Sequence, residues 1–144
     1  RKPPFDLPDD LGGLALTAAE VADAAGVRAA WYTALRGLFA RFDVLALPTA
    51  QCFPFDAEMH WPREIAGRPM DSYHRWMEVV IGGTLSGCPV VSVPAGFGEQ
   101  GLPMGLQLIG PMRSDMRLLQ IAAAWEKAAD WSRRVPPGIA PTSR

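Results

Sequence analysis

Residues 87–97 read GCPVVSVPAGF and residues 101–110 read GLPMGLQLIG, and these two runs decide the fold. Residues 90–93 and 104–109 are short segments of β-branched and other apolar side chains, which is typical of strands. The glycine-rich stretch 96–101 between them suits a turn. The sequence therefore predicts two strands that pair as neighbours.

Capping and periodicity predict a helix far upstream of these strands. Thr17 and Glu20 have the spacing of a capping box, and Leu16 and Val21 that of a hydrophobic staple. Gly26 marks where a kink or local break would fall, because glycine costs a helix about 1 kcal/mol relative to alanine. The apolar residues that recur at helical spacing and form one stripe are Val27, Ala30, Trp31, Ala34, Leu35, Leu38 and Phe39.

The segment after this helix divides into a strand and a loop. Residues 43–48 form a continuous apolar run that ends at Pro48, which favours a strand buried on both faces of a sheet. Residues 50–70 combine scattered Pro and Gly with several aromatic side chains. This pattern indicates a long irregular loop that packs on the body of the protein.

Two more helices complete the pattern. Asp71 or Ser72 is expected to cap one of them, and Gly87 to end it in the left-handed conformation. Ser114 is expected to cap the last helix, whose apolar stripe is Leu118, Ile121, Ala122, Trp125 and Ala129. Helices and strands that alternate in this way indicate an α/β fold. Residues 1–16 are expected to form an extended lead-in and residues 136–144 a loose tail.

Composition excludes several classes of function. The 144 residues and the 49% hydrophobic content suffice for one compact domain. Lys and Arg total 14 against 15 Asp and Glu, so we expect neither a nucleic-acid nor a membrane partner. The apolar runs are shorter than the roughly 20 residues of a spanning helix, and Cys52 and Cys88 are too few for a disulfide framework. These features favour a cytoplasmic protein.

The runs at 87–97 and 101–110 resemble the C-terminal hallmark of amidase-signature enzymes. The segment FDVLALPT at 42–49 resembles an earlier strand of that family, and residues 118–126 resemble its last helix. The resemblance implies that residues 17–135 are the C-terminal part of a single amidase domain, an α/β/α sandwich around a mixed sheet. It also implies the reaction of the parent protein, which is hydrolysis of a carboxamide to a carboxylate and an amine or ammonia.

The catalytic residues that this resemblance implies have no counterpart in the sequence. The family uses a Ser nucleophile, a second Ser and a Lys, in a Gly- and Ser-rich region that precedes this segment. The chain contains only Lys2 and Lys127, and its serines are scattered without a Gly-Ser-Ser run that would supply donors for an oxyanion. We therefore expect no catalytic residue here and no activity of the chain alone.

Part of a substrate pocket is what the resemblance leaves to this chain. Similar enzymes surround the acyl portion of the substrate with the helix before the Gly-x-Pro motif and with the preceding loop. Thr49 also follows a strand at the edge where ligands approach α/β sheets. Trp76 has an alternative role in the core, as aromatic residues on one helical face often do. The expected pocket residues are Thr49, Trp76, Val80, Gly83 and Thr84.

Other sites are weaker interpretations of the same residues. Cys88 lacks a His or acid at a recognisable spacing, which favours packing over nucleophilic catalysis. A zinc set of Cys52, His60, His74 and Cys88 lacks the short paired spacings of structural sites. The arginines at 113, 117, 133 and 134 are interleaved with acids, as on a solvated surface. We expect no metal and no cofactor.

Three hypotheses remain open from the sequence. The chain is a fragment of an amidase whose partners are the missing N-terminal catalytic portion and a small-molecule amide. Alternatively, it is a binding or interaction module that keeps the architecture without the chemistry. A third hypothesis is a homo-oligomer, because strand edges and apolar surface left uncovered invite self-association.

Overall fold

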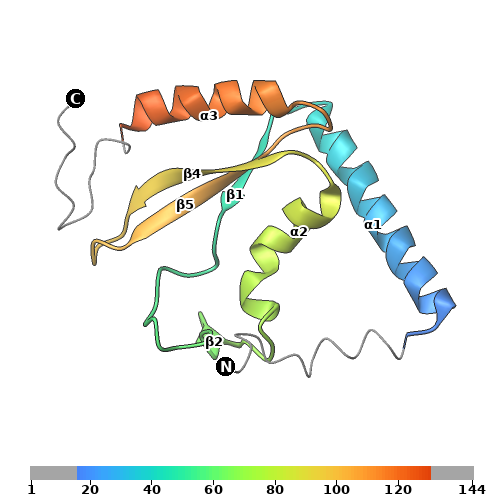
Figure 1. Ribbon diagram of the computed structural model, residues 1–144, viewed down its shortest axis with the longest axis horizontal. Coiled ribbons are helices and arrows are strands. Elements are labelled where there is room, and N and C mark those ends of the chain that lie inside the picture. The colour runs from blue at the N-terminus through green and yellow to red at the C-terminus, as the bar shows by residue number, and fades with distance from the viewer. Residues whose placement is uncertain (1–15, 131–144) are drawn as a thin grey trace, which may run out of the picture.

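A computed structural model describes residues 16–130 of the chain (Figure 1). The expected lead-in, apart from Leu16, and the expected tail lie outside these residues. The described part contains a three-stranded sheet with helices on both sides, which confirms the α/β class.

The sheet is formed by β1 (Leu45–Pro48), β5 (Pro103–Ile109) and β4 (Val90–Phe97), in that order. β5 is the central strand and pairs antiparallel with both neighbours. The predicted pairing of the two hallmark strands is therefore confirmed, with Val91 opposite Leu108. The register shifts between Pro94 and Gly96, where an irregularity is tolerated because β4 is an edge strand of this sheet.

Side chains alternate between the two faces of the sheet, as the period of two requires. One face carries Val93 and Leu108, which pack with Leu118 and Ala122 of α3 (Asp115–Ala129) into a buried cluster. The other face is covered by α2 (Glu78–Ser86), and α1 (Ala18–Phe39) lies beyond α2 (Figure 1). The described chain therefore has three layers, with the sheet in the middle.

α1 forms without interruption across Gly26, and its N-terminus has the predicted capping box. Thr17 Oγ1 accepts a hydrogen bond from the backbone N–H of Glu20 at 3.3 Å, and Glu20 Oε2 accepts one from the backbone N–H of Thr17 at 2.7 Å. Of the apolar stripe only Leu35 is fully buried, whereas Val27 is 71% exposed. The hydrogen bonds that join α1 to α2 come from Arg28 and Trp31, and every described residue of the helix before Trp31 is exposed.

Replacing Thr17 by Ala is expected to lower the free energy of unfolding by about 1 kcal/mol, because the cap loses its hydroxyl acceptor. Urea unfolding followed by circular dichroism measures the change. Hydrogen bonds from the backbone N–H and from the hydroxyl of Thr17 lower the pKa of Glu20, and alanine removes the hydroxyl, which donates at 2.8 Å. The contribution of this bond to the ionised carboxylate is present above the unfolded pKa of Glu20. It is lost as the pH falls through the folded pKa, so the cost of the substitution should shrink in acid. A cost that grows with acidity would contradict this account of the capping box.

The expectation that residues 43–48 are buried on both faces is wrong. In β1 the side chains of Leu45 and Leu47 are half-buried, while Ala46 and Pro48 are exposed. β1 pairs only with β5, and α3 packs on β4 and β5. The outer face of β1 therefore has no covering layer among the described residues.

The segment expected to be irregular contains a small β-ribbon. β2 (Glu64–Ile65) pairs antiparallel with β3 (Arg68–Pro69). Ala66 and Gly67 join them with φ values of 50° and 78°, the positive pair that a tight hairpin turn requires. Gly67 was the only turn signal in the sequence at this point, because alanine is an unusual residue in that conformation.

The predicted caps of the second and third helices are wrong in detail. A short 3₁₀ turn, η2 (Arg75–Met77), precedes α2, and Gln51 Oε1 accepts the backbone N–H of Val79 at 3.1 Å in place of a cap from Asp71 or Ser72. Ser114 occupies the cap position of α3, but its hydroxyl donates to the Pro111 carbonyl at 2.6 Å. Gly87 ends α2 at φ 68°, as predicted.

Candidate functional site

A recess of about 380 Å³ lies between α2 and the sheet face that points toward it. It is open to solvent, and the described residues that line it include no charged side chain. Its walls come from the end of β1, from α2 and the turn after it, and from β4 and β5. The lining residues are Thr49, Val80, Gly83, Thr84, Cys88, Val90, Ser92 and Gln107.

Gln107 is the only strongly buried polar side chain of the lining set, with 3% of its surface exposed. Its Nε2 donates to the Pro48 carbonyl at 2.8 Å and to the Val79 carbonyl at 2.9 Å. The NH₂ group of the amide can donate to two carbonyl oxygens, whereas the amide oxygen can only accept. The two bonds therefore assign the atom that faces both carbonyls as Nε2 and the other as Oε1. One side chain thus joins the central strand to β1 and to α2.

Two glycines leave the space that the recess needs. A Cβ on Gly83 would lie 3.1 Å from Gln107 Oε1 and 3.4 Å from Ile109 Cδ1. A Cβ on Gly105 would overlap Thr49 Oγ1. Thr49 approaches this closely because its backbone N–H donates to the Gly105 carbonyl at 3.0 Å.

Replacing Gly105 by Ala is expected to lower the free energy of unfolding by about 2 kcal/mol, since the added methyl group displaces Thr49. Combining it with Thr49→Ala removes the hydroxyl and methyl groups that the new Cβ meets. The double variant should therefore recover more stability than the sum of the single changes predicts. Chemical denaturation of the four proteins tests this, and strictly additive changes would show that the two residues do not clash.

The C-terminal end of α2 is held over the sheet by side chains that accept or donate at its last turn. Trp31 Nε1 donates to the Gly82 carbonyl and Arg28 Nε to the Leu85 carbonyl, both at 2.8 Å. Ser86, 4% exposed, donates to the Gly83 carbonyl at 2.6 Å and accepts from the Cys88 N–H at 3.0 Å. These bonds pair backbone groups at the helix end, where the helix itself supplies no partner. They hold the C-terminal end of α2 in its position beside the recess.

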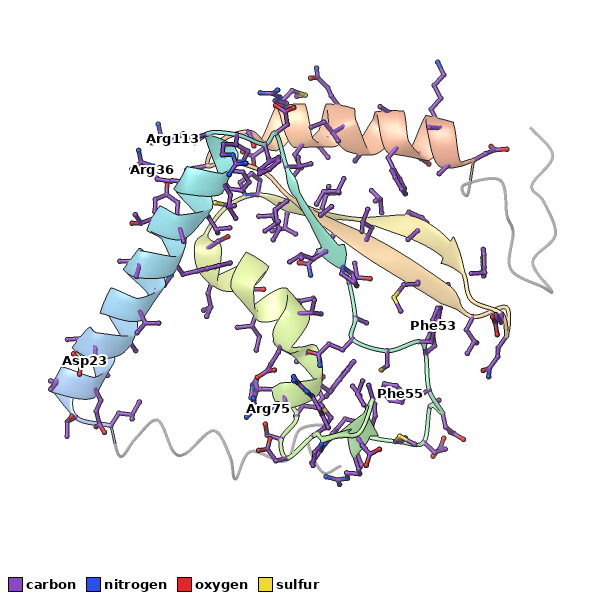
Figure 2. The ribbon with its side chains drawn as sticks, turned by 180° about the vertical axis from the view of Figure 1, so that it is seen from behind. Asp23, Arg36, Phe53, Phe55, Arg75 and Arg113 are labelled. Atoms are coloured by element: carbon purple, nitrogen blue, oxygen red, sulfur yellow. The ribbon has the colours of Figure 1, made fainter. Side chains whose placement is uncertain are left out.

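Four of the five residues expected in the pocket line this one recess, namely Thr49, Val80, Gly83 and Thr84. Trp76 is not among its lining residues. It stacks edge-to-face on Phe55 and Tyr73, with ring centroids 5.5 and 6.0 Å apart. Figure 2 labels Phe55 on the long segment that leads to β2 and Arg75 at the start of the second helical region. Trp76 Nε1 is buried and has no acceptor within the described part of the chain.

Sequence reasoning missed Gln107, Ser92, Cys88 and Val90 as lining residues. The signal for Gln107 was available, because it is the one polar side chain in the apolar strand GLQLIG. Ser92 and Val90 alternate with the inward-facing valines of β4, and this places them on the α2 side. Which face of that strand bounds a recess depends on where α2 packs.

Besides Gln107, the polar groups of the recess are three hydroxyls, of Thr49, Thr84 and Ser92, and the thiol of Cys88. The Thr84 hydroxyl donates to the Val80 carbonyl at 3.2 Å. Lys127 lies on α3, on the opposite side of the sheet. Within residues 16–130 no three His, Cys, Asp or Glu side chains are placed to hold a metal ion, so Cys52, His60, His74 and Cys88 do not converge. Burial raises the pKa of the Cys52 thiol, which disfavours a thiolate.

Comparison with known proteins assigns the chain to a family. The family model named Amidase matches residues 10–119, so the chain belongs to the amidase-signature family. A glutamyl-tRNA(Gln) amidotransferase subunit of Synechococcus sp. (strain CC9311) is 40% identical over 100 residues, which are 69% of this chain and 19% of that protein. The same subunit of Ralstonia pickettii (strain 12J) is 55% identical over 53 residues, 37% of this chain and 11% of that protein.

A solved structure extends the likeness to three dimensions. A bacterial aryl acylamidase of the amidase-signature family superimposes with a TM-score of 0.79 at 29% sequence identity. The match covers 91% of this chain and 27% of that enzyme. The matched part of the chain therefore spans 19% and 11% of these two curated relatives and 27% of the solved enzyme.

None of the helices between residues 16 and 130 has both the length and the apolar character that a membrane span requires.

Proposed function

We propose that residues 17–135 are the C-terminal part of an amidase, which hydrolyses a carboxamide C–N bond to a carboxylate and an amine or ammonia. The observation that carries this proposal is the superposition on the aryl acylamidase. The match includes 91% of this chain and corresponds to 27% of that enzyme. The Amidase match over residues 10–119 supports the same interpretation. The Ser-Ser-Lys catalytic set then belongs to a portion of the polypeptide outside this chain.

In this proposal the recess forms part of the wall around the amide substrate. Val80 and Val90 supply apolar surface, and Thr49 and Ser92 supply hydroxyl groups that orient a polar ligand. Trp76 acts from the neighbouring aromatic cluster and not from the recess itself. The substrate is a small neutral amide, because the described lining has no ionised side chain to pair with a charged one.

The remaining portion of the amidase is the partner that covers the apolar side chains left exposed here. Val27 and Leu85 are 71% and 49% exposed beside each other along the junction of α1 and α2, and Phe42 is 52% exposed. Exposed apolar surface of this kind usually marks a contact that another chain segment completes. We place the enzyme in the cytoplasm, where the free thiols of Cys52 and Cys88 stay reduced.

Ammonia release from a panel of simple carboxamides tests the proposal. A longer native polypeptide that contains these residues should release ammonia, and the 144-residue chain alone should not. The intact mass of the natively expressed protein identifies whether such a longer form exists. Amide turnover by the 144-residue chain would overturn the claim that its catalytic set lies elsewhere.

A binding module is the second candidate, because the curated relatives are named as subunits of an amidotransferase and so function within an assembly. A native product that starts near Arg1, without any longer form, would favour this alternative. Light scattering then separates a partner-binding monomer from a homo-oligomer, since only the oligomer has a mass that rises with concentration.

A further inference from the structure

Gln107 holds its side-chain oxygen in place without a donor from the described part of the chain. The side chain makes two hydrogen bonds within the described residues, and Nε2 donates both, to Pro48 and Val79. Among the described residues, Trp76 Nε1 is the one buried side-chain N or O atom that lacks a partner. Gln107 Oε1 therefore retains contact with solvent, and the residue reaches solvent through the recess that it lines.

The oxygen is pre-oriented, which distinguishes it from the hydroxyls nearby. Rotating the amide would place Oε1 against the two carbonyl oxygens that Nε2 now contacts, so the two acceptors prevent the flip. The side chain is 3% exposed and cannot swing away. A ligand that donates a hydrogen bond to this atom loses little conformational entropy, because the acceptor is already ordered.

The chemistry of the recess selects the kind of donor. Its described lining has no ionised side chain, so an ammonium ion gains no charge partner there. A carboxylate brings only acceptor oxygens toward the Gln107 oxygen and is repelled. A neutral N–H or O–H donor meets both conditions, and the amide N–H is the one that the proposed carboxamide substrate has.

We propose that Gln107 is a specificity-determining residue whose Oε1 accepts an amide N–H of a neutral carboxamide bound in the recess. This inference rests on the proposed amidase function and names the group by which the substrate is recognised. It also gives the site a preference between substrate and product. The amide donates to Gln107, whereas the carboxylate product has no N–H to donate.

Two ligands that differ in a single group test the proposal. N-methylbenzamide and methyl benzoate have nearly the same shape, but the ester has an oxygen where the amide has its N–H. Titration into the ¹⁵N-labelled 144-residue chain is followed through the side-chain NH₂ signals of Gln107. We expect N-methylbenzamide to bind about tenfold tighter, the factor that one hydrogen bond to an otherwise unpaired acceptor supplies.

A variant and its control test whether Gln107 Oε1 causes the preference for the amide over the ester. Gly83→Ala brings a Cβ to 3.1 Å from Gln107 Oε1 and should reduce the tenfold ratio to about one. Gly37→Ala, on α1, meets no atom within 4 Å and should leave the ratio unchanged. If Gly83→Ala does not fold, the two ligands on the unaltered chain still decide the question.

Equal affinity of the two ligands, or no shift of the recess signals with either, would overturn the role of Gln107. The ammonia assay fails or succeeds independently of this result. Ammonia release by the longer polypeptide without an N–H preference would reject only the inference on Gln107. An N–H preference in a protein that never hydrolyses amides would keep the binding site and reject the amidase.

Discussion

Replacing Leu118 by Ala is expected to lower the free energy of unfolding by about 3 kcal/mol, within the usual cost of removing a buried leucine side chain. Leu118 is 3% exposed and packs with Val93, Leu108 and Ala122, the cluster that joins α3 to the sheet. The substitution leaves a cavity at the only layer contact that this face of the sheet has in the described chain. Urea unfolding followed by circular dichroism gives the difference.

The adjacent residue is a matched control. Leu119 is 56% exposed on the same helix, so Leu119→Ala deletes the same atoms without opening a cavity. Its effect should stay within about 0.5 kcal/mol. Equal losses for the two variants would mean that α3 does not pack on the sheet through the face that carries Leu118.

Replacing Gln107 by Leu is expected to cost about 2 kcal/mol and to release α2 from the sheet, because two part-buried carbonyls lose a donor and an unpaired acceptor costs about 1–3 kcal/mol when fully buried. The leucine fills most of the volume but cannot donate to the carbonyls of Pro48 and Val79, which now accept at 2.8 and 2.9 Å. The substitution therefore affects two acceptors at once. The measurement is the urea midpoint together with the hydrogen-exchange rate of the α2 amides.

Gln120→Leu on the exposed side of α3 is the control for this substitution. It makes the same chemical change where water replaces the lost partner, so stability should change by less than about 0.5 kcal/mol. If the exchange of α2 amides in Gln107→Leu matches that of the unaltered chain, Gln107 does not hold the helix. That outcome would also remove the reason for its fixed orientation in the recess.

Local features were predictable where neighbouring residues determine them. The capping box of Thr17 and Glu20, the left-handed Gly87 and the pairing of β4 with β5 all depend on groups a few residues apart, or on a turn that joins adjacent strands. The caps of α2 and α3 were not predictable in the same way. Gln51 reaches the start of α2 from 28 residues away, and no local pattern encodes that distance.

The residues of the candidate site were likewise predictable only where local sequence determines their position. Four of the five expected pocket residues line one recess, because α2 carries three of them on one face and Thr49 follows the strand beside it. Trp76 was misplaced relative to the recess because the α-helix begins after it, at Glu78, so its position follows η2 and the aromatic cluster. The burial of β1 was mistaken since an apolar run does not reveal whether a second layer covers it.

The sequence alone determined the α/β pattern and the family resemblance, because both depend on residue types in order. Only the tertiary structure brought out Gln107, whose amide contacts the carbonyls of residues 59 and 28 positions away. A glutamine in an apolar strand has the same local signal whether it faces solvent, a recess or two backbone acceptors. Its role depends on the packing of α2 and β1 around it, which is a property of the folded chain.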